Sequence, residues 1–191
     1  PGRSKPPKFI IHVLREREGE NLERIQVIKG WLNDKGENQE KVHNVAWSGE
    51  RKMQDKGKLP PVGDTVDLSV PTWTNTIGAA ELSVVWTDPD FDAGQRAFYY
   101  VRVLENPTCR WSQKLCNARG VDCEDPQTIR EGLEDCCSPT HRPVIQERAW
   151  TSPIWYSPPG ARAIAAGADS LGSLEENFVG DETFSPAGTS H

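Results

Sequence analysis

One segment, residues 96–105, limits the fold more than any other part of this sequence. It is rich in aromatic and β-branched residues, which favour strands, and its apolar side chains fall on both sides of the alternating pattern. A strand that is covered on both faces needs neighbouring strands from elsewhere in the chain. We expect residues 81–86 and 148–156 to lie beside it.

Alternating apolar residues predict several more strands, at 8–14, 23–33, 40–47 and 65–70. The second and third of these form a hairpin, because Gly36 stands in the turn between them, where a positive φ is required. The last predicted strand, 148–156, contains Pro153, which confines it to a sheet edge or a bulge.

The alternation ends at residue 106. From there to residue 144 proline, cysteine and charged residues dominate, which predicts a long loop with one or two helical turns at 126–133. We therefore expect an all-β fold, an antiparallel β-sandwich of about six to eight strands with Ig-like packing. Five tryptophans are expected in its core or seam: Trp31, Trp47, Trp86, Trp150 and Trp155.

The predicted domain organisation has three parts. Residues 1–7, rich in Pro, Gly and Lys, form a linker, and residues 8–157 form the sandwich domain with its loop insertion at about 106–144. Residues 158–191 are rich in Ala, Gly and Ser and acidic, which predicts a flexible, disordered tail. The first seven residues resemble a linker within a longer protein, so we expect a fragment or a processed C-terminal portion.

Composition excludes some partners. The formal net charge of −6 disfavours a nucleic-acid backbone. No apolar run approaches the roughly 20 residues that a membrane-spanning helix needs.

Five cysteines, at 109, 116, 123, 136 and 137, gather in the predicted loop. Such clustering indicates either disulfides or a metal site. No pair has Cys-x-x-Cys spacing and His141 is the one imidazole nearby, so disulfides are favoured. Two bridges with one cysteine left over are typical of an exported protein.

Glu105, Arg110 and Trp111 follow the end of the 96–105 strand, where a scaffold commonly fixes functional side chains. The guanidinium of Arg110 suits a phosphate or sulfate group, and Trp111 suits the wall of a pocket. These three are candidate cleft-rim or anion-binding residues. The structural alternative is a loop-packing pair in which Arg110 stacks on Trp111.

Asp88, Asp90 and Asp92 have the spacing that opens a calcium-binding loop. The sixth and twelfth places hold Ala93 and Tyr99 instead of Gly and Glu, so these carboxylates are weak metal candidates and an acidic connection between strands is favoured. The sequence contains no Gly-x-Ser-x-Gly or phosphate-loop motif, and we assign no catalytic residue.

Six segments carry a resemblance to a known family: 25–31, 41–48, 75–82, 86–92, 96–112 and 146–156. Together they resemble the C-terminal end of the bacterial domain-of-unknown-function 3604 family, over about residues 7–158. The resemblance implies a relative of the polymerase-and-histidinol-phosphatase type of metallohydrolase. It also implies a metal-binding catalytic part on the N-terminal side, and a location in the periplasm or outside the cell.

The four histidines, at 12, 43, 141 and 191, lie in separate segments, so we expect no cofactor here and divalent metals in the N-terminal part. The expected function is that of a non-catalytic accessory domain of an exported metal-dependent hydrolase acting on phosphate-type or related esters. It would support the catalytic domain, which is its expected partner, and it would contribute a loop to the catalytic cleft. The alternative is an independent binding module that uses exposed tryptophans for a glycan or a protein. An exposed apolar patch favours the first, and a concave aromatic site favours the second.

Overall fold

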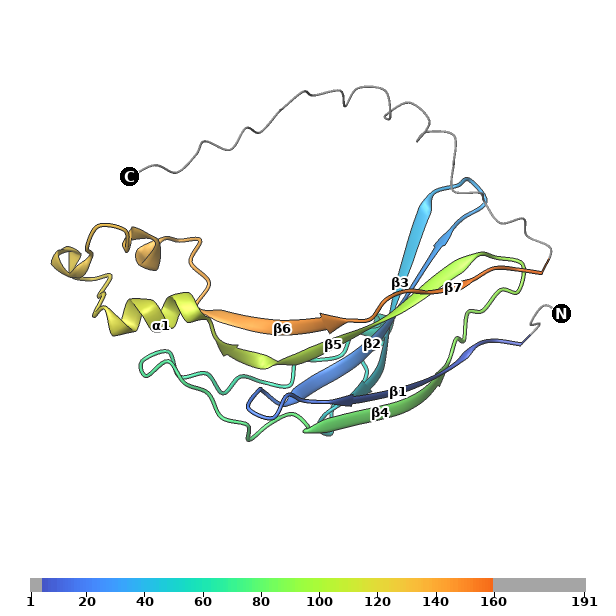
Figure 1. The fold of residues 1–191 in the computed structure, drawn as a ribbon, viewed down its shortest axis with the longest axis horizontal. Coiled ribbons are helices and arrows are strands. Elements are labelled where there is room, and N and C mark those ends of the chain that lie inside the picture. Colours follow the sequence, from blue (N-terminus) through green and yellow to red (C-terminus); the bar gives the residue numbers. More distant parts are fainter. Residues whose placement is uncertain (1–4, 160–191) are drawn as a thin grey trace, which may run out of the picture. The chain divides into compact units, whose positions relative to one another are not determined.

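The computed structural model describes residues 5–159 (Figure 1). The first four residues of the predicted linker and the predicted tail from residue 160 lie outside the described residues. The described part contains seven strands, one α-helix and three short 3-10 helices. Their bounds are β1 Lys8–Leu14, β2 Leu22–Leu32, β3 Asn38–Trp47, η1 Asp55–Gly57, β4 Glu81–Thr87, β5 Ala97–Cys109, α1 Trp111–Ala118, η2 Pro126–Thr128, η3 Glu134–Cys137, β6 Val144–Trp150 and β7 Ile154–Tyr156.

The strands form two antiparallel sheets, as predicted (Figure 1). β1 and β4 make a two-stranded sheet, in register from Lys8 opposite Thr87 to Leu14 opposite Glu81. The larger sheet has the order β3-β2-β5-β6, and β7 also pairs with β5. β6 and β7 therefore lie beside β5 as expected. The predicted pairing of β5 with residues 81–86 is wrong, because β2 takes that place.

β2 displaces β4 because it is the most apolar and most buried strand. Ile25, Val27 and Ile28 are at most 1% exposed. The alternate residues Ile25 and Val27 join Ile11 of β1 and Tyr99 of β5 in a core between the two sheets. The inner faces of β1 and β4 complete this core, with Phe9, Val13, Leu82, Val84 and Trp86 packed against it.

The opposite face of the larger sheet carries a second apolar group. The ring of Phe98 lies where a side chain at Gly30 would project, so any larger residue there would have to displace this ring. Phe98 contacts the ring of Trp155 of β7 at 5.2 Å between centroids and stacks with Tyr100 at 6.4 Å. Trp155 nevertheless stays 72% exposed and Trp150 59% exposed, so the prediction that these two tryptophans are packed is wrong.

β5 continues further than predicted. It passes through Pro107 to Cys109, and its pairing with β6 shifts register between Leu104 and Pro107. A proline lacks the N–H that a regular ladder uses, and this irregularity accommodates it. At Pro153 the last predicted strand divides into β6 and β7. Between them, Thr151 is hydrogen-bonded to the backbone of Val101 through both its N–H and its hydroxyl.

The predicted loop contains a helix that the sequence pattern did not indicate. α1 has eight residues, too few for stability on its own, and the Cys116–Cys136 disulfide joins it to η3. A second disulfide links Cys123 to Cys137. The prediction of two bridges and one unpaired cysteine is confirmed. Cys109, a disulfide candidate, is the free one, because it lies buried at the end of β5.

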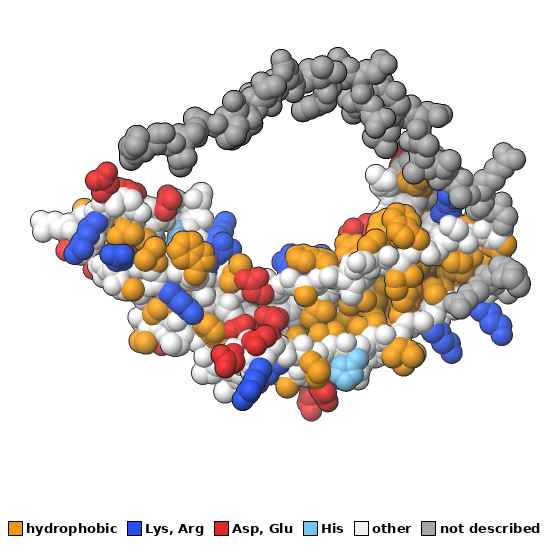
Figure 2. Space-filling model, viewed as in Figure 1, with side chains coloured by type: hydrophobic (Ala, Val, Ile, Leu, Met, Phe, Trp, Pro, Cys, Tyr) orange, Lys and Arg blue, Asp and Glu red, His pale blue; other side chains and the backbone are white. Residues whose placement is uncertain are grey.

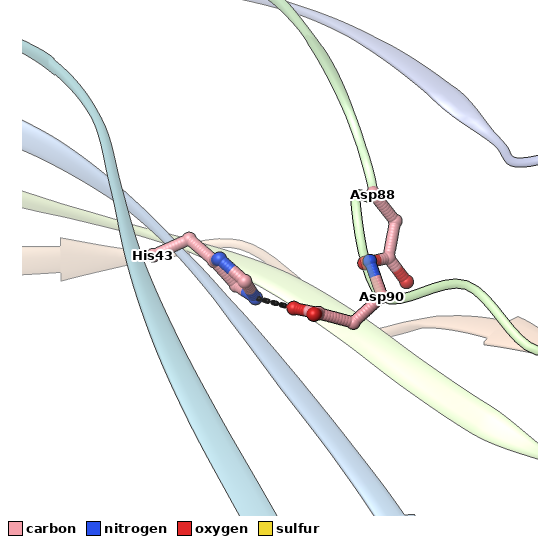
Figure 3. A group of neighbouring side chains, drawn as sticks. All are labelled: His43, Asp88 and Asp90. Atoms are coloured by element: carbon pink, nitrogen blue, oxygen red, sulfur yellow. Dashed lines mark hydrogen bonds and ion pairs between the residues drawn. The ribbon is translucent and has the colours of Figure 1, made fainter. Parts of the chain in front are cut away.

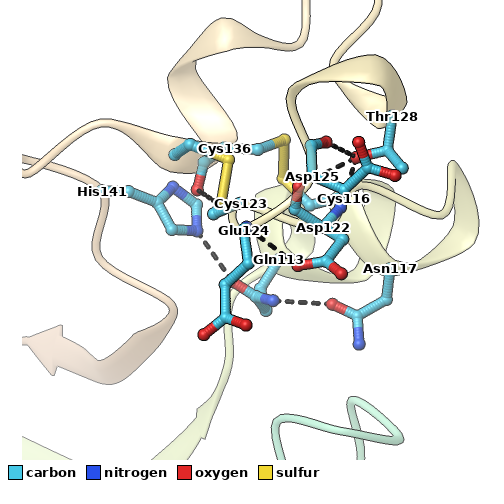
Figure 4. The surroundings of a disulfide bond; sticks show 11 residues. Gln113, Cys116, Asn117, Asp122, Cys123, Glu124, Asp125, Thr128, Cys136 and His141 are labelled. Carbon is cyan, nitrogen blue, oxygen red and sulfur yellow. Dashed lines mark hydrogen bonds between the residues drawn. A yellow bond between two sulfur atoms is a disulfide. The ribbon is translucent and has the colours of Figure 1, made fainter.

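Side-chain hydrogen bonds support the same region. His141 Nε2 and Gln113 Oε1 are hydrogen-bonded at 2.9 Å, and the amide nitrogen of Gln113 donates to Asn117 Oδ1 (Figure 4). The Thr128 hydroxyl donates hydrogen bonds to the backbone carbonyls of Asp122 and Asp125.

Of the helical turns predicted at 126–133, Pro126–Thr128 forms a 3-10 helix. The predicted strand at 65–70 is wrong, since one isolated bridge from Asp67 to Thr72 is all that forms there.

Candidate functional site

Arg110 connects β5 to α1 and borders an open hollow of about 400 Å³ along β6. Its backbone N–H donates to the carbonyl of Pro143 at 2.8 Å, which brings it beside Arg142. The hollow is lined by these two arginines, Arg148, Trp150 and the strand between them. The Nε of Arg110 is buried and has no hydrogen-bond partner. We call this place the arginine hollow.

The other two candidates predicted with Arg110 do not line the hollow. Trp111 begins α1 and is 72% exposed. The cation–π contacts among residues 5–159 join Lys29 to Trp31 and Tyr99, and Lys114 to Trp73, so Arg110 does not stack on Trp111.

Glu105 of β5 lies among other carboxylates. Burial, and then the neighbouring Glu20, Glu147 and Glu16, raise the pKa of its carboxyl above the ordinary 4.5. Its carbonyl oxygen accepts a hydrogen bond from Gln146, which is part of the hollow's lining. Glu105 is therefore connected to the hollow only by this backbone hydrogen bond to Gln146, while its side chain belongs to an acidic group. Figure 2 shows acidic side chains gathered near the middle of the face in view.

A second polar cluster lies at the end of the core, where β4 leads into its turn. Asp88 is 2% exposed and its Oδ2 accepts hydrogen bonds from the Lys29 ammonium at 2.7 Å and the Tyr99 hydroxyl at 2.8 Å. Its Oδ1 accepts from the backbone N–H of Asp90. Burial alone would raise the pKa of Asp88, but the hydrogen bonds from Lys29, Asp90 and Tyr99 outweigh it and lower that pKa below 3.8. Burial and the bond to Asp88 raise the pKa of Tyr99.

His43 of β3 lies at the rim of this cluster and points toward Asp90 (Figure 3). Its Nε2 is buried, has no hydrogen-bond partner and lies 3.8 Å from Asp90 Oδ2. Burial and then the charge of Lys41 lower the pKa of His43 below 6.5. A neutral imidazole is therefore favoured.

His43, Asp88 and Asp90 are the one group of three or more His, Cys, Asp or Glu residues in 5–159 whose potential ligand atoms all lie within 4.8 Å of one another. Asp92 is outside it, and its carboxylate accepts from the N–H of Gly94. Two ammonium groups are already paired with these carboxylates: Lys29 lies 2.7 Å from Asp88, and Lys41 lies 2.6 Å from Asp90. Positive charges so close oppose a cation, so ion binding by Asp88, Asp90 and Asp92 stays a hypothesis that the geometry disfavours.

Glu23 of β2, 1% exposed, forms a third charged cluster. Its Oε1 lies 2.6 Å from Arg24 and 2.7 Å from Arg51, and its Oε2 accepts from Gln146. Burial opposes the charge, but these three donors outweigh it and lower the pKa of Glu23 below 4.5. Arg51 also donates to the carbonyls of Glu23, Ser48 and Pro60. The cluster fastens the loop after β3 to β2 and fixes Gln146 beneath the arginine hollow.

Exposed apolar side chains surround β1. On its outer side, Ile10 is 85% exposed and stands opposite Val85, which is 65% exposed. On its other side, a hollow of about 260 Å³ opens between the start of β1 and β7, lined mainly by aromatic and apolar residues that include Phe9, Ile154 and Trp155. Figure 2 shows a band of hydrophobic side chains on the half of the molecule that contains β1, β5 and β7. We call Ile10, Leu14, Val85, Ile154 and Trp155 the β1 surface.

Sequence reasoning missed Lys29, Glu23, Arg142 and Arg148. Lys29 and Glu23 could have been found, because each is a charged residue inside an apolar strand. Such residues are buried only when they are paired, so their position indicates a buried ion pair. Arg142 and Arg148 offer no signal, since only the return of the chain at Pro143 brings them to Arg110.

Residues 2–158 match the model of a family described as "Protein of unknown function (DUF3604)". The chain belongs to the DUF3604 family. The match extends over both sheets, both disulfides and the arginine hollow of this DUF3604 chain. No curated protein and no solved structure matches it. In its described residues, no helix is both long and apolar enough to cross a membrane.

Proposed function

We propose that this DUF3604 chain is a non-catalytic domain that supports the catalytic part of an exported metal-dependent hydrolase. The catalytic part belongs to the same polypeptide, precedes this chain and holds the divalent metals. The domain is an Ig-like β-sandwich, and the loop that carries Arg110 borders the catalytic cleft. The two disulfides support an oxidising compartment, the periplasm or the cell exterior.

The observation that carries the proposal is the β1 surface. β1 pairs only with β4 among the described residues, so its other edge is open. Exposed apolar side chains flank that edge on both sides, at Ile10 and at Ile154 with Trp155. Open strand edges and contiguous apolar patches are the places where another folded part is expected to pack.

The position of β1 in the chain favours the catalytic part as the occupant. β1 begins at Lys8, so a domain attached on the N-terminal side enters beside this strand. The charge networks of the described residues are consistent with a supporting role, because the buried carboxylates Asp88 and Glu23 are fully paired with basic side chains.

The first test is the coding sequence on both sides of residues 1–191. The proposal expects an in-frame segment ahead of residue 1 that encodes clustered His and Asp residues. A start codon directly before residue 1 would overturn it.

The second test changes the β1 surface in the longer protein. Replacing Ile10 and Val85 together with lysine should lower its melting temperature and its hydrolase activity, while the isolated domain keeps its own unfolding midpoint. Val70→Lys is the matched control, because Val70 is 62% exposed and lies outside the surface. If the double variant and the control behave alike in the longer protein, the catalytic part does not pack on β1.

A second candidate function is an independent binding module. It is favoured by the exposed rings of Trp150 and Trp155, and by the Phe98 and Tyr100 rings beside the latter. Exposed aromatic rings of this kind offer apolar faces on which a sugar ring can pack. Saturable binding of an oligosaccharide by the isolated domain, lost in Trp155→Ala, would support this candidate over the first.

A further inference from the structure

We propose that the arginine hollow binds a phosphate or sulfate ester, with the oxyanion held by Arg110, Arg142 and Arg148 and the organic group against Trp150. The site uses no residue of the β1 surface, so it does not depend on the proposed packing role.

The first argument is charge. Three guanidinium groups line the hollow, and Glu147 is the one carboxylate in the lining. None of the three has an ion pair within the described residues 5–159. The buried carboxylate of Glu23 is paired with Arg24 and Arg51 and reaches the hollow only through Gln146. The acidic group of Glu105, Glu20 and Glu16 adjoins the hollow at Glu147. Within the lining itself, three arginines against one glutamate leave an excess of positive charge.

The second argument is the unsatisfied donor on Arg110. Its Nε is buried, yet it has no hydrogen-bond partner. Leaving a buried charged donor unpaired is unfavourable, and a turn of the Arg110 side chain toward an oxyanion in the hollow would satisfy it. Arginine presents a planar set of donors that matches two oxygens of a phosphate or sulfate, so three arginines suit a tetrahedral group with several acceptor oxygens.

The third argument is the rigidity of the hollow's base. The N–H of Arg110 is bonded to Pro143, and Gln146 is bonded to both Glu23 and the carbonyl of Glu105. β6 pairs only with β5 among the described strands, so its outer edge is open to a ligand. The hollow thus exists before a ligand arrives, which lowers the entropy cost of binding.

The fourth argument selects an ester over a free ion. Trp150 lines the hollow and is 59% exposed, so an apolar ring stands beside the positive charges with no protein group covering most of it. A ligand that carries an oxyanion on a flat apolar group satisfies both features together.

The experiment is isothermal titration of the 191-residue chain, whose described residues contain both sheets and both disulfides. The probes are phenyl phosphate, phenyl sulfate, inorganic phosphate and benzyl alcohol. We expect saturable binding of at least one ester, weaker binding of inorganic phosphate and none of benzyl alcohol. Raising the salt concentration should weaken ester binding.

The variants assign the binding to the hollow. Arg148→Ala should weaken ester binding about tenfold, because a charge-assisted hydrogen bond is lost, and Arg148→Lys should restore part of it. Trp150→Ala should weaken the esters while leaving inorganic phosphate unchanged. Arg130→Ala, an exposed arginine of the disulfide-bonded region, is the matched control and should change nothing.

Three outcomes would overturn the proposal. The first is the absence of saturable binding by either ester to a correctly folded domain. The second is an equal effect of Arg148→Ala and Arg130→Ala. The third is tighter, Arg148-dependent binding of a glutamate-rich peptide, which would make the hollow a site for an acidic protein partner. Circular dichroism of each variant shows that a loss of binding is not a loss of fold.

Discussion

The buried cluster around Asp88 and the arginine hollow both contain charged side chains, and the two places differ in how many of these charges have partners. In the first, both carboxylate oxygens of Asp88 accept hydrogen bonds, from Lys29, Tyr99 and the backbone of Asp90. In the second, Arg110 has a buried donor without a partner, and Arg142 and Arg148 have no ion pair within residues 5–159. The complete pairing of Asp88 indicates a structural role for this carboxylate, although His43 Nε2 at the rim of the same cluster has no hydrogen-bond partner among the described residues. Three arginines that line one hollow without an ion pair in that part of the chain indicate a place for a ligand.

The largest effect is expected from Asp88→Ala. It leaves the Lys29 ammonium, whose side chain is 3% exposed, without its carboxylate. Removing one partner of a buried ion pair costs about 3–5 kcal/mol in the free energy of unfolding. Urea denaturation of the isolated domain measures it. Asp92→Ala, an exposed aspartate four residues on, is the control and should cost little. Equal costs would mean that the buried network does not stabilise the fold.

Tyr99→Phe tests the same buried cluster around Asp88 with a smaller change. It removes only the hydroxyl that donates to Asp88 at 2.8 Å, and hydrogen bonds to charged groups contribute about 1.5–3 kcal/mol. Tyr100→Phe is the neighbouring control, since no protein hydrogen bond is formed by that hydroxyl among the described residues. An equal stability loss in both variants would point to a general cost of removing a tyrosine hydroxyl instead of the bond to Asp88.

Glu105→Gln gives a pH-dependent effect. The folded-state pKa of Glu105 is raised above 4.5, so ionising it destabilises the fold as the pH rises from about 4.5 through that raised pKa. The glutamine variant should therefore be more stable than the parent at about pH 8 and equal to it at about pH 4. Glu40→Gln, on the exposed part of β3, should show no such difference. The measurement is the urea midpoint across this pH range, and a pH-independent difference would contradict it.

The smallest stability effect is expected from Arg148→Ala. Arg148 is exposed and has no ion pair in the described part of the chain, so its removal should change the free energy of unfolding by less than about 0.5 kcal/mol. Thermal denaturation checks this. A large loss of stability would show that the hollow holds the fold together, and the comparison between the two clusters would then fail.

Much of the fold could be predicted from local patterns, because alternation specifies a strand and its faces. β1, the β2–β3 hairpin and β4 were found this way. Local patterns could not predict which strands pair. The strand beside β5 is β2 and not β4, because strand burial depends on the whole core. α1 was missed because a disulfide distant in sequence, instead of an amphipathic repeat, supports it.

The site was harder to predict than the fold. Arg110 was selected for its place at the end of a strand, and it does line a hollow. Its companions there are Arg142, Arg148 and Trp150, which follow a long excursion of the chain through the disulfide-bonded region. Glu105, five residues before it, and Trp111, the first residue of α1, do not line the hollow, because the Glu105 side chain lies among other carboxylates and Trp111 is 72% exposed.

Hydrogen exchange of β1 tests the proposed supporting role most directly. The amides of Lys8–Leu14 would be followed in the isolated domain and in the longer protein that includes the catalytic part. If the catalytic part packs on the β1 surface, exchange across this strand slows in the longer protein while that of β6 changes less. Equal exchange of β1 in the two proteins would contradict the account.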